Sequence, residues 1–252
     1  MRICRFINTN SQTCYGIIEN TTVTEIDNSP FEDYSITDKS YDLDELKLLA
    51  PCVPSKIVAI GLNYKDHAAE MNKKIPEDPM LFLKPGSSVI GNEDKIIYPA
   101  HMSKRVDYEG ELAVIIKRVA KNVSMENAMD FVLGYSCLND VTARDLQSKD
   151  IQFTRAKGFD TFAPIGPWIE TDIDPTNLDI KTFLNGELKQ NSSTSNLIFN
   201  IPKLINFISH VMTLYPGDVI STGTPGGIGP MKIGDKVGIT IQSIGTLTNY
   251  VG

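Results

Sequence analysis

The sequence lacks any long hydrophobic run. Its longest uninterrupted apolar stretch, Leu112–Ile116, is far shorter than the roughly 18 residues that a membrane-spanning helix needs. A secretory signal peptide needs an apolar stretch of about 7–15 residues near the N-terminus, and the opening sequence MRICRFIN is interrupted too early for that. We therefore expect a soluble, cytoplasmic protein that does not act on a membrane.

Cysteine and positive charge are also scarce. The four cysteines form no CxxC pair and no regular framework, which is typical of reduced thiols in a cytosolic protein. With 24 Lys+Arg against 31 Asp+Glu, the formal net charge is −7. Nucleic acids and anionic membranes favour basic patches, so we expect neither as a partner. A small molecule bound in a pocket with local positive charge fits this composition better.

What the sequence does contain is typical of a globular protein. Hydrophobic residues make up 41% and charged residues 22% of the 252 residues. A chain of this length buries roughly 70–75% of its unfolded surface without disulfides or structural metals. Short β-like segments broken by Asn, Thr and Ser indicate a small N-terminal β domain over residues 1–50, followed by a proline-bracketed connector. The larger domain covers residues 51–252.

Strand patterns outnumber helix patterns in the chain. A helix is predicted near Leu43–Leu49 with Asp42 as its N-cap, and another over Tyr64–Met71 with Asn63 as its N-cap. Regular alternation of strands and helices is missing, which argues against Rossmann and TIM folds. We expect a mainly β protein with a few helices, of the α+β class. The other predicted elements are strands at Lys56–Leu62, Met80–Leu83, Leu112–Ile116 and Leu133–Leu138, an amphipathic helix from Pro202 to Met212, and a hairpin over Lys236–Val251.

Three acids could form a metal site. Glu109 and Glu111 are two residues apart, so on a strand both carboxylates point to the same face. Two such charges at the edge of a core repel each other unless a cation neutralises them, although both could instead be exposed at a solvated strand end. Asp140 follows another predicted strand and could converge on them, or it could cap a helix. Oxygen ligands of this kind favour Mg²⁺, Mn²⁺ or Ca²⁺ over Zn²⁺.

Further candidate residues lie on either side of the acids in the sequence. His67 and Glu70 share a helix face, where a carboxylate can orient an imidazole as a base, but an exposed surface pair fits equally. Lys157 could reach a substrate carboxylate or be solvated. Thr224 lies in the glycine-rich segment 221–230, which is neither a phosphate loop nor a nucleotide fingerprint. Its glycines would let the backbone approach a ligand, or they simply form a turn.

An ordered series of motifs carries a family resemblance. The motifs are GLNYKDHAAEM from Gly61, FLKP from Phe82, VDYEGEL from Val106, NDVTARD from Asn139, KGFD from Lys157, and GD at Gly217 leading into TGTP from Thr222. Together these motifs resemble the fumarylacetoacetate hydrolase family, from about Lys56 to the C-terminus. Several motifs in the same order are more specific than any one of them.

The resemblance implies a fold and a site. The implied fold is a mixed β-sandwich with a barrel-like roll, in the branch that contains acylpyruvate hydrolases and oxaloacetate decarboxylases, and the implied assembly is a homodimer. By the family pattern, the His67–Glu70 helix belongs to a lid, and Lys157 joins this pair in catalysis. The implied ligands of Mg²⁺ or Mn²⁺ are Glu109, Glu111 and Asp140, and the implied contacts to the oxo-acid substrate are Arg144, Gln147 and Thr224.

These implications predict a reaction class. The chain would act on 2-oxo or β-diketo acids through a metal-stabilised enolate, hydrolysing a C–C bond with water activated by His67 or decarboxylating oxaloacetate. Isomerisation or tautomerisation of muconate-like or oxaloacetate-type acids needs no nucleophilic water and is the alternative. A catalytically idle oxo-acid binder is a second alternative, although it would have no need of a base. The polar segment Asn72–Asp78 is expected to order only when an oxo-acid such as oxalate binds.

Overall fold

The computed structural model describes all 252 residues and confirms a mainly β protein, with twenty strands and four α-helices. The chain opens with an antiparallel meander of β1 (Arg2–Ile7), β2 (Thr13–Glu19), β3 (Thr22–Ile26) and β4 (Ile36–Asp42), while β5 (Lys47–Leu49) pairs with the other edge of β1. A small apolar cluster fills this part of the molecule: Cys4, Phe6, Ile18 and Val23.

The N-terminal strands join the rest of the molecule through one strand pair. β1 pairs with β14 (Ala163–Glu170), where Arg2 lies opposite Glu170 and Ile3 opposite Ile169. One continuous sheet therefore runs through both regions in the order β4-β3-β2-β1-β14-β12-β11-β17-β6-β7, and β8 pairs with β14. Its remaining strands are β6 (Lys56–Ile60), β7 (Leu81–Pro85), β8 (Val89–Ile90), β11 (Gly110–Ile116), β12 (Val132–Asn139) and β17 (Val219–Ser221).

Two smaller sheets complete the β architecture. A five-stranded sheet contacts β11, β12 and β14 and encloses the main hydrophobic core of 35 buried residues. It consists of β16 (Glu187–Ser193), β15 (Asp179–Leu184), β19 (Lys236–Ile241), β20 (Gly245–Val251) and β9 (Lys95–Ile96). A three-stranded sheet holds β13 (Thr142–Ala143), β10 (Val106–Tyr108) and β18 (Gly229–Met231). The layered sheets, with β19 and β20 as the predicted hairpin, match the expected sandwich.

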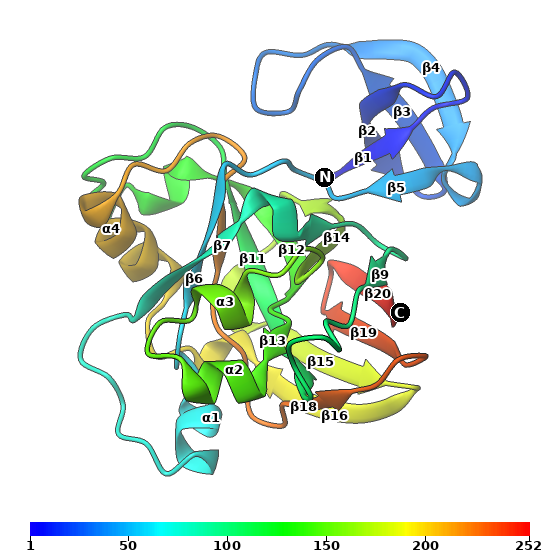
Figure 1. Ribbon diagram of the computed structural model, residues 1–252. Helices are drawn as coiled ribbons and strands as arrows, with labels where there is room; N and C mark the ends of the chain where they lie inside the picture. Colours follow the sequence, from blue (N-terminus) through cyan, green and yellow to red (C-terminus); the bar gives the residue numbers. More distant parts are fainter.

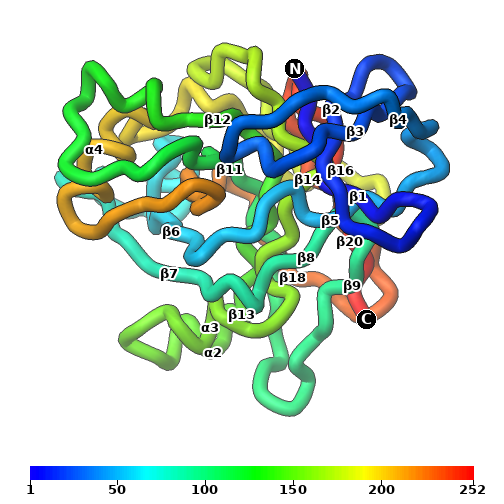
Figure 2. The backbone as a smooth tube through the Cα atoms, turned by 90° about the horizontal axis from the view of Figure 1, so that it is seen from above, coloured from blue at the N-terminus to red at the C-terminus, as the bar shows by residue number.

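The helices are short and peripheral. α1 (Lys65–Glu70), α2 (Arg144–Lys149) and α3 (Thr154–Lys157) lie on the side opposite the N-terminal strands (Figure 1). Seen from above, α2 and α3 lie at one edge of the molecule, away from those strands (Figure 2). α4 (Ile201–Val211) confirms the predicted amphipathic helix, because Asn200 caps it and its apolar face is buried. None of the helices is long and apolar enough to cross a membrane.

Two predictions about helices are wrong. Asp42 does accept a hydrogen bond from the Asp44 amide, but it caps only a 3₁₀ turn at Leu43–Glu45, after which β5 pairs with β1. Edge pairing therefore overrides the local helix signal. Asn63 does not cap α1. Its amide instead joins distant segments, since it donates to the carbonyls of Phe199 and Thr222 and accepts from the Phe199 amide.

Candidate active site

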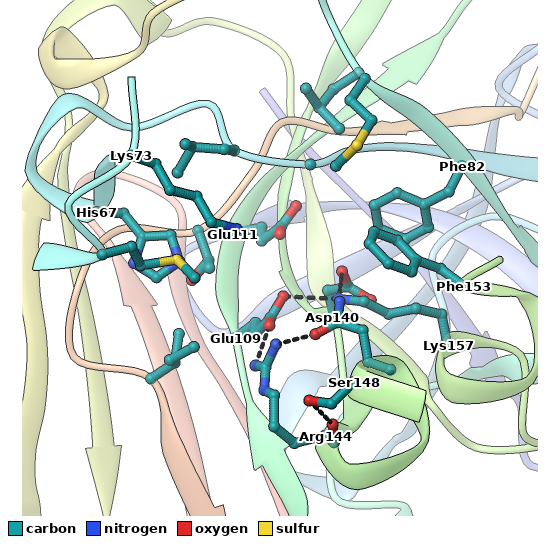
Figure 3. Close-up of a pocket in the computed structure, with 18 residues that line it drawn as sticks. His67, Lys73, Phe82, Glu109, Glu111, Asp140, Arg144, Ser148, Phe153 and Lys157 are labelled. Atoms are coloured by element: carbon teal, nitrogen blue, oxygen red, sulfur yellow. Dashed lines mark hydrogen bonds and ion pairs between the residues drawn. The ribbon is translucent and has the colours of Figure 1, made fainter. Parts of the chain in front are cut away.

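Three carboxylates meet at the end of the β11–β12 pair. Glu109, Glu111 and Asp140 each offer an oxygen within 4.8 Å of the others, and all three residues are buried (Figure 3). The Asp140 amide donates to the Glu109 carbonyl at 2.8 Å, and the Glu109 amide donates to the Asn139 side chain at 2.9 Å. The strand pairing thus places the acids together, so neither a solvated strand end nor a helix cap describes them.

Cations compensate two of these acids but not the third. Lys157 Nζ lies 2.8 Å from Glu109 Oε2 and also contacts Asp140, while Arg144 contacts Glu109 from the other side. Burial alone would raise the pKa of Glu109, but Lys157 and Arg144 outweigh it and hold that pKa at about 2. Glu111 accepts hydrogen bonds only from the Ser221 hydroxyl and the Gly223 amide.

Glu111 is the one acid of this cluster with no hydrogen bond or ion pair from a lysine or arginine. Burial, together with the negative charges of Asp140 and Glu109, raises the pKa of Glu111 to about 8. A divalent cation among the three carboxylates would remove both the repulsion and the uncompensated burial. The donor set consists of hard oxygens, which Mg²⁺ and Mn²⁺ prefer. The residues present therefore fit such an ion, held by Glu109, Glu111 and Asp140.

A second buried lysine also serves this cluster, and the motif analysis did not single it out as a site residue. Lys84 is the last residue but one of β7, is fully buried, and donates to Asp140 Oδ1 at 2.6 Å and to the Val141 carbonyl at 3.2 Å. Burial lowers the pKa of Lys84, whereas the pKa of Lys157 is raised because Asp140 and Glu109 outweigh its burial. The sequence signal was a lysine within an otherwise apolar strand, in the motif FLKP.

Arg144 and Gln147 on α2 line the pocket as the resemblance implied. All three nitrogens of the Arg144 guanidinium already have partners within the protein. Nε donates to Asp107 at 2.9 Å, one terminal nitrogen donates to Gln147 Oε1 at 2.5 Å, and the other contacts Glu109. Asp107 is itself fully buried and also accepts from Arg105. In this structure, Arg144 acts foremost on the orientation and charge of Glu109.

Thr224 also lines the pocket, and its hydroxyl is already hydrogen-bonded within the protein. It donates to the carbonyl of Gly110, between the two glutamates, at 2.9 Å, and it accepts from Gln190 Nε2 at 2.9 Å. Gln190 Oε1 in turn accepts from the Gly110 amide at 3.0 Å. Gln190 is buried on β16 and was missed by the sequence analysis, because nothing in a lone glutamine on a polar strand indicates that it holds a distant peptide.

The predicted histidine pair forms at the opposite wall of the same pocket. His67 Nδ1 lies 3.0 Å from Glu70 Oε2, and the Gly227 amide donates to both Glu70 oxygens at 3.2 Å. The His67 side chain is 9% exposed and that of Glu70 is 50% exposed. His67 is therefore not half of an exposed surface pair, because its ring faces the cavity that contains the three carboxylates (Figure 3).

The cavity has a volume of about 370 Å³ and one apolar wall. Phe82 and Phe153 meet edge to face with ring centroids 5.6 Å apart, and Lys157 Nζ lies 5.0 Å from the Phe82 ring centre. These two rings place apolar surface beside the charged cluster. The combination of a carboxylate cluster, buried ammonium groups and one oriented imidazole suits a small anionic substrate that changes its charge during reaction.

The order of these motifs and the geometry agree with a comparison of the chain with known families. Residues 56–252 match the model described as fumarylacetoacetate (FAA) hydrolase C-terminal. The chain belongs to the fumarylacetoacetate hydrolase family. Residues 1–51 match a second family, described as Rv2993c-like, N-terminal.

Relatives within the fumarylacetoacetate hydrolase family carry several activities in their names. Oxaloacetate tautomerase YisK of Bacillus subtilis is 46% identical over 84% of this chain and 75% of its own length. A 5-carboxymethyl-2-hydroxymuconate delta-isomerase from Mycobacterium smegmatis superposes with a TM-score of 0.94 at 45% identity, covering 100% of this chain and 99% of its own. A maleylpyruvate hydrolase from Sphingobium, solved with manganese(II) and pyruvate, superposes with a TM-score of 0.83 at 32% identity, covering 100% and 98%.

Proposed function

We propose that this protein is a divalent-metal-dependent enzyme that interconverts the keto and enol forms of a small 2-oxo acid of the oxaloacetate type. The observation that carries the proposal is that one cavity holds an oriented imidazole, His67, and three buried carboxylates that together suit a divalent cation. Mg²⁺ or Mn²⁺ held by Glu109, Glu111 and Asp140 would supply the positive charge that favours an enolate at the substrate's keto oxygen.

The chain's own residues account for the proton transfer. Glu70 holds His67 Nδ1, so Nε2 of the same ring is the position that removes the proton from the carbon beside the ketone. The proton that His67 receives returns to the enolate oxygen or to the same carbon, so no further reactant is needed. Lys157 adds positive charge next to Glu109 and Asp140, and the Phe82–Phe153 wall keeps water from the carbanionic carbon.

C–C bond hydrolysis, which the motif analysis placed first together with oxaloacetate decarboxylation, is the second candidate. It needs the same enolate chemistry and, in addition, a water molecule activated by His67 for attack on a distal carbonyl. The similarity to a maleylpyruvate hydrolase over the whole chain supports it. We place tautomerisation first because two relatives, the Bacillus subtilis protein at 46% identity and the Mycobacterium smegmatis protein at 45%, are named as a tautomerase and an isomerase. A binder without activity would need neither a base nor the buried lysines.

Product identification tests the proposal. The protein would be offered oxaloacetate, acetylpyruvate and fumarylpyruvate separately with Mg²⁺, and products followed by enol absorbance and by NMR. Faster enol–ketone exchange of oxaloacetate without loss of carbon supports the tautomerase. Release of pyruvate and a second acid from a diketo acid would instead establish hydrolysis, and release of CO₂ would establish decarboxylation. No turnover of any of the three would overturn the proposed substrate class.

A further inference from the structure

The loop Thr224–Ile228 carries the peptide that holds the catalytic pair. The Gly227 amide donates to both carboxylate oxygens of Glu70, and Glu70 Oε2 lies 3.0 Å from His67 Nδ1. Because the Glu70 side chain is half exposed, water competes for its oxygens and a fixed backbone donor decides where the carboxylate points. The orientation of His67 therefore depends on how firmly the Gly227 peptide is held.

The backbone at this point has little rigidity of its own. Gly226 and Gly227 are consecutive glycines, which have more conformational freedom than any other residues. Gly227 adopts φ +92°, and a Cβ atom there would lie 2.3 Å from the carbonyl oxygen of Lys189. No other residue fits this position, so the loop needs contacts from outside to fix it.

One such contact comes from the strand that leads into the carboxylate cluster. Tyr108, the last residue of β10, donates its hydroxyl to the carbonyl of Gly227 at 3.1 Å. Tyr108 is 3% exposed, so little water competes with the Gly227 carbonyl for its hydroxyl. Gly229 lies opposite Tyr108 in β18, and a Cβ atom at Gly229 would lie only 2.8 Å from the Tyr108 hydroxyl.

We propose that Tyr108 is a positioning residue for the His67–Glu70 pair, acting through the backbone of Gly227. The Tyr108 hydroxyl holds the Gly227 carbonyl, the Gly227 amide on the other side of the same Cα atom holds Glu70, and Glu70 contacts His67. Tyr108 thereby links the strand that precedes Glu109 to the helix that carries the base. This inference rests on the proposed role of His67 as the base.

A double-mutant cycle tests the inference. Tyr108→Phe removes only the hydroxyl, and we expect kcat to fall about ten-fold with KM for oxaloacetate and affinity for Mn²⁺ unchanged. In a Glu70→Gln background, the same change should cause no further loss, because the chain of hydrogen bonds is already broken at Glu70. Equal fold-losses in both backgrounds, or weakened Mn²⁺ binding by Tyr108→Phe, would overturn the inference and indicate that Tyr108 acts on the neighbouring Glu109.

Two further variants keep the result interpretable. Gly229→Ala retains the hydroxyl but displaces it, so kcat should fall in the same way as for Tyr108→Phe. Tyr135→Phe, at a buried tyrosine outside the pocket, is the matched control and should leave kcat unchanged. If His67→Ala keeps full activity, the proposed function fails. If His67→Ala loses activity while the Tyr108 cycle is additive, only this inference fails.

Discussion

The two sides of the cavity are built in different ways. Glu109, Glu111 and Asp140 are 6%, 1% and 1% exposed and are fixed by strand pairing and by buried cations. His67, the proposed base, lies on α1, a helix of six residues, and its partner Glu70 has a side chain that is half exposed. The carboxylate cluster is thus formed by the fold itself, whereas the proposed base lies on an element with few contacts.

This difference has a physical reason. Buried carboxylates can be assembled only where fixed donors and cations offset their desolvation, and a sheet core provides these. A base must meet a substrate that enters and leaves, which favours a small element at the surface. The comparison predicts that changes on the carboxylate side will remove cation binding and turnover together, and that changes on the helix side will affect turnover alone.

The largest effect is expected for Glu109→Ala. The change removes one of three carboxylates and leaves Arg144 and Lys157 without their common partner. Turnover with Mg²⁺ should fall by about a thousand-fold or more, together with loss of Mn²⁺ binding measured by calorimetry. Asp130→Ala, at an exposed acid, serves as the control. Full activity of Glu109→Ala would show that the ligand assignment is wrong.

His67→Ala should have a smaller effect of a different kind. Loss of a general base costs typically about 10²–10⁴-fold in kcat, while the carboxylates stay in place. Mn²⁺ should therefore bind with wild-type affinity. His210→Ala is the matched control, because His210 is exposed on α4 and remote from the cavity. Weakened Mn²⁺ binding in His67→Ala would show that the helix side of the cavity also contributes to cation binding, which contradicts the comparison.

The carboxylate side should also respond to pH. Glu111 has a pKa of about 8 in the folded, metal-free protein against an ordinary 4.5, so the folded state holds a proton that the unfolded state has released. Stability of the metal-free protein should therefore fall as pH rises from about 4.5 through 8. The lowered pKa of Glu109 affects stability only below about pH 4.5, where the unfolded state takes up a proton that the folded state does not. Urea unfolding at pH 6 and pH 9, with and without Mg²⁺, measures this.

Metal binding gives the complementary signal. Because Glu111 must lose its proton, Mg²⁺ affinity should rise about ten-fold per pH unit up to about pH 8 and then level off. Glu111→Gln should remove the loss of stability with rising pH. A stability profile of that variant that still matches the wild type would assign the pH dependence to another group.

The smallest expected effect concerns the segment that follows α1. Residues Asn72–Asp78 should gain protection from hydrogen exchange when oxalate and Mg²⁺ bind, since Lys73 of this segment and the preceding Met71 line the cavity. Strands β2 and β3, which contain no residue of the cavity, should show no change and act as the internal control. Equal protection of 72–78 with and without oxalate would argue against ordering of this segment by the substrate.

Much of this architecture follows from sequence patterns. Buried strands such as β6 and β11 are runs of apolar β-formers, and α4 shows helical spacing together with proline in its first turn. The carboxylate cluster was predictable because Glu109 and Glu111 lie two residues apart at the start of β11 and Asp140 directly follows the neighbouring strand β12. Local patterns are sufficient where the structure depends on periodicity along one segment.

Other features depend on contacts between distant segments, which local patterns do not contain. The helix signal at Leu43–Leu49 is overridden because β5 pairs with β1. Lys84 and Gln190 gain their roles from groups 56 and 80 residues away in sequence. The contact of Arg144 with Glu109 and the hydrogen bond from Thr224 to Gly110 likewise form only when the tertiary structure brings these segments together.

The most direct test is the rate of oxaloacetate enol–ketone exchange catalysed by metal-stripped protein, before and after addition of Mg²⁺ or Mn²⁺. Metal ions without protein, and Glu109→Ala with metal ions, correct for exchange that the ions cause by themselves. We expect negligible catalysis by the metal-stripped protein, and full recovery of the exchange rate when metal is added to the wild type but not to Glu109→Ala. Undiminished catalysis by the stripped protein, or none with metal restored, would contradict this expectation.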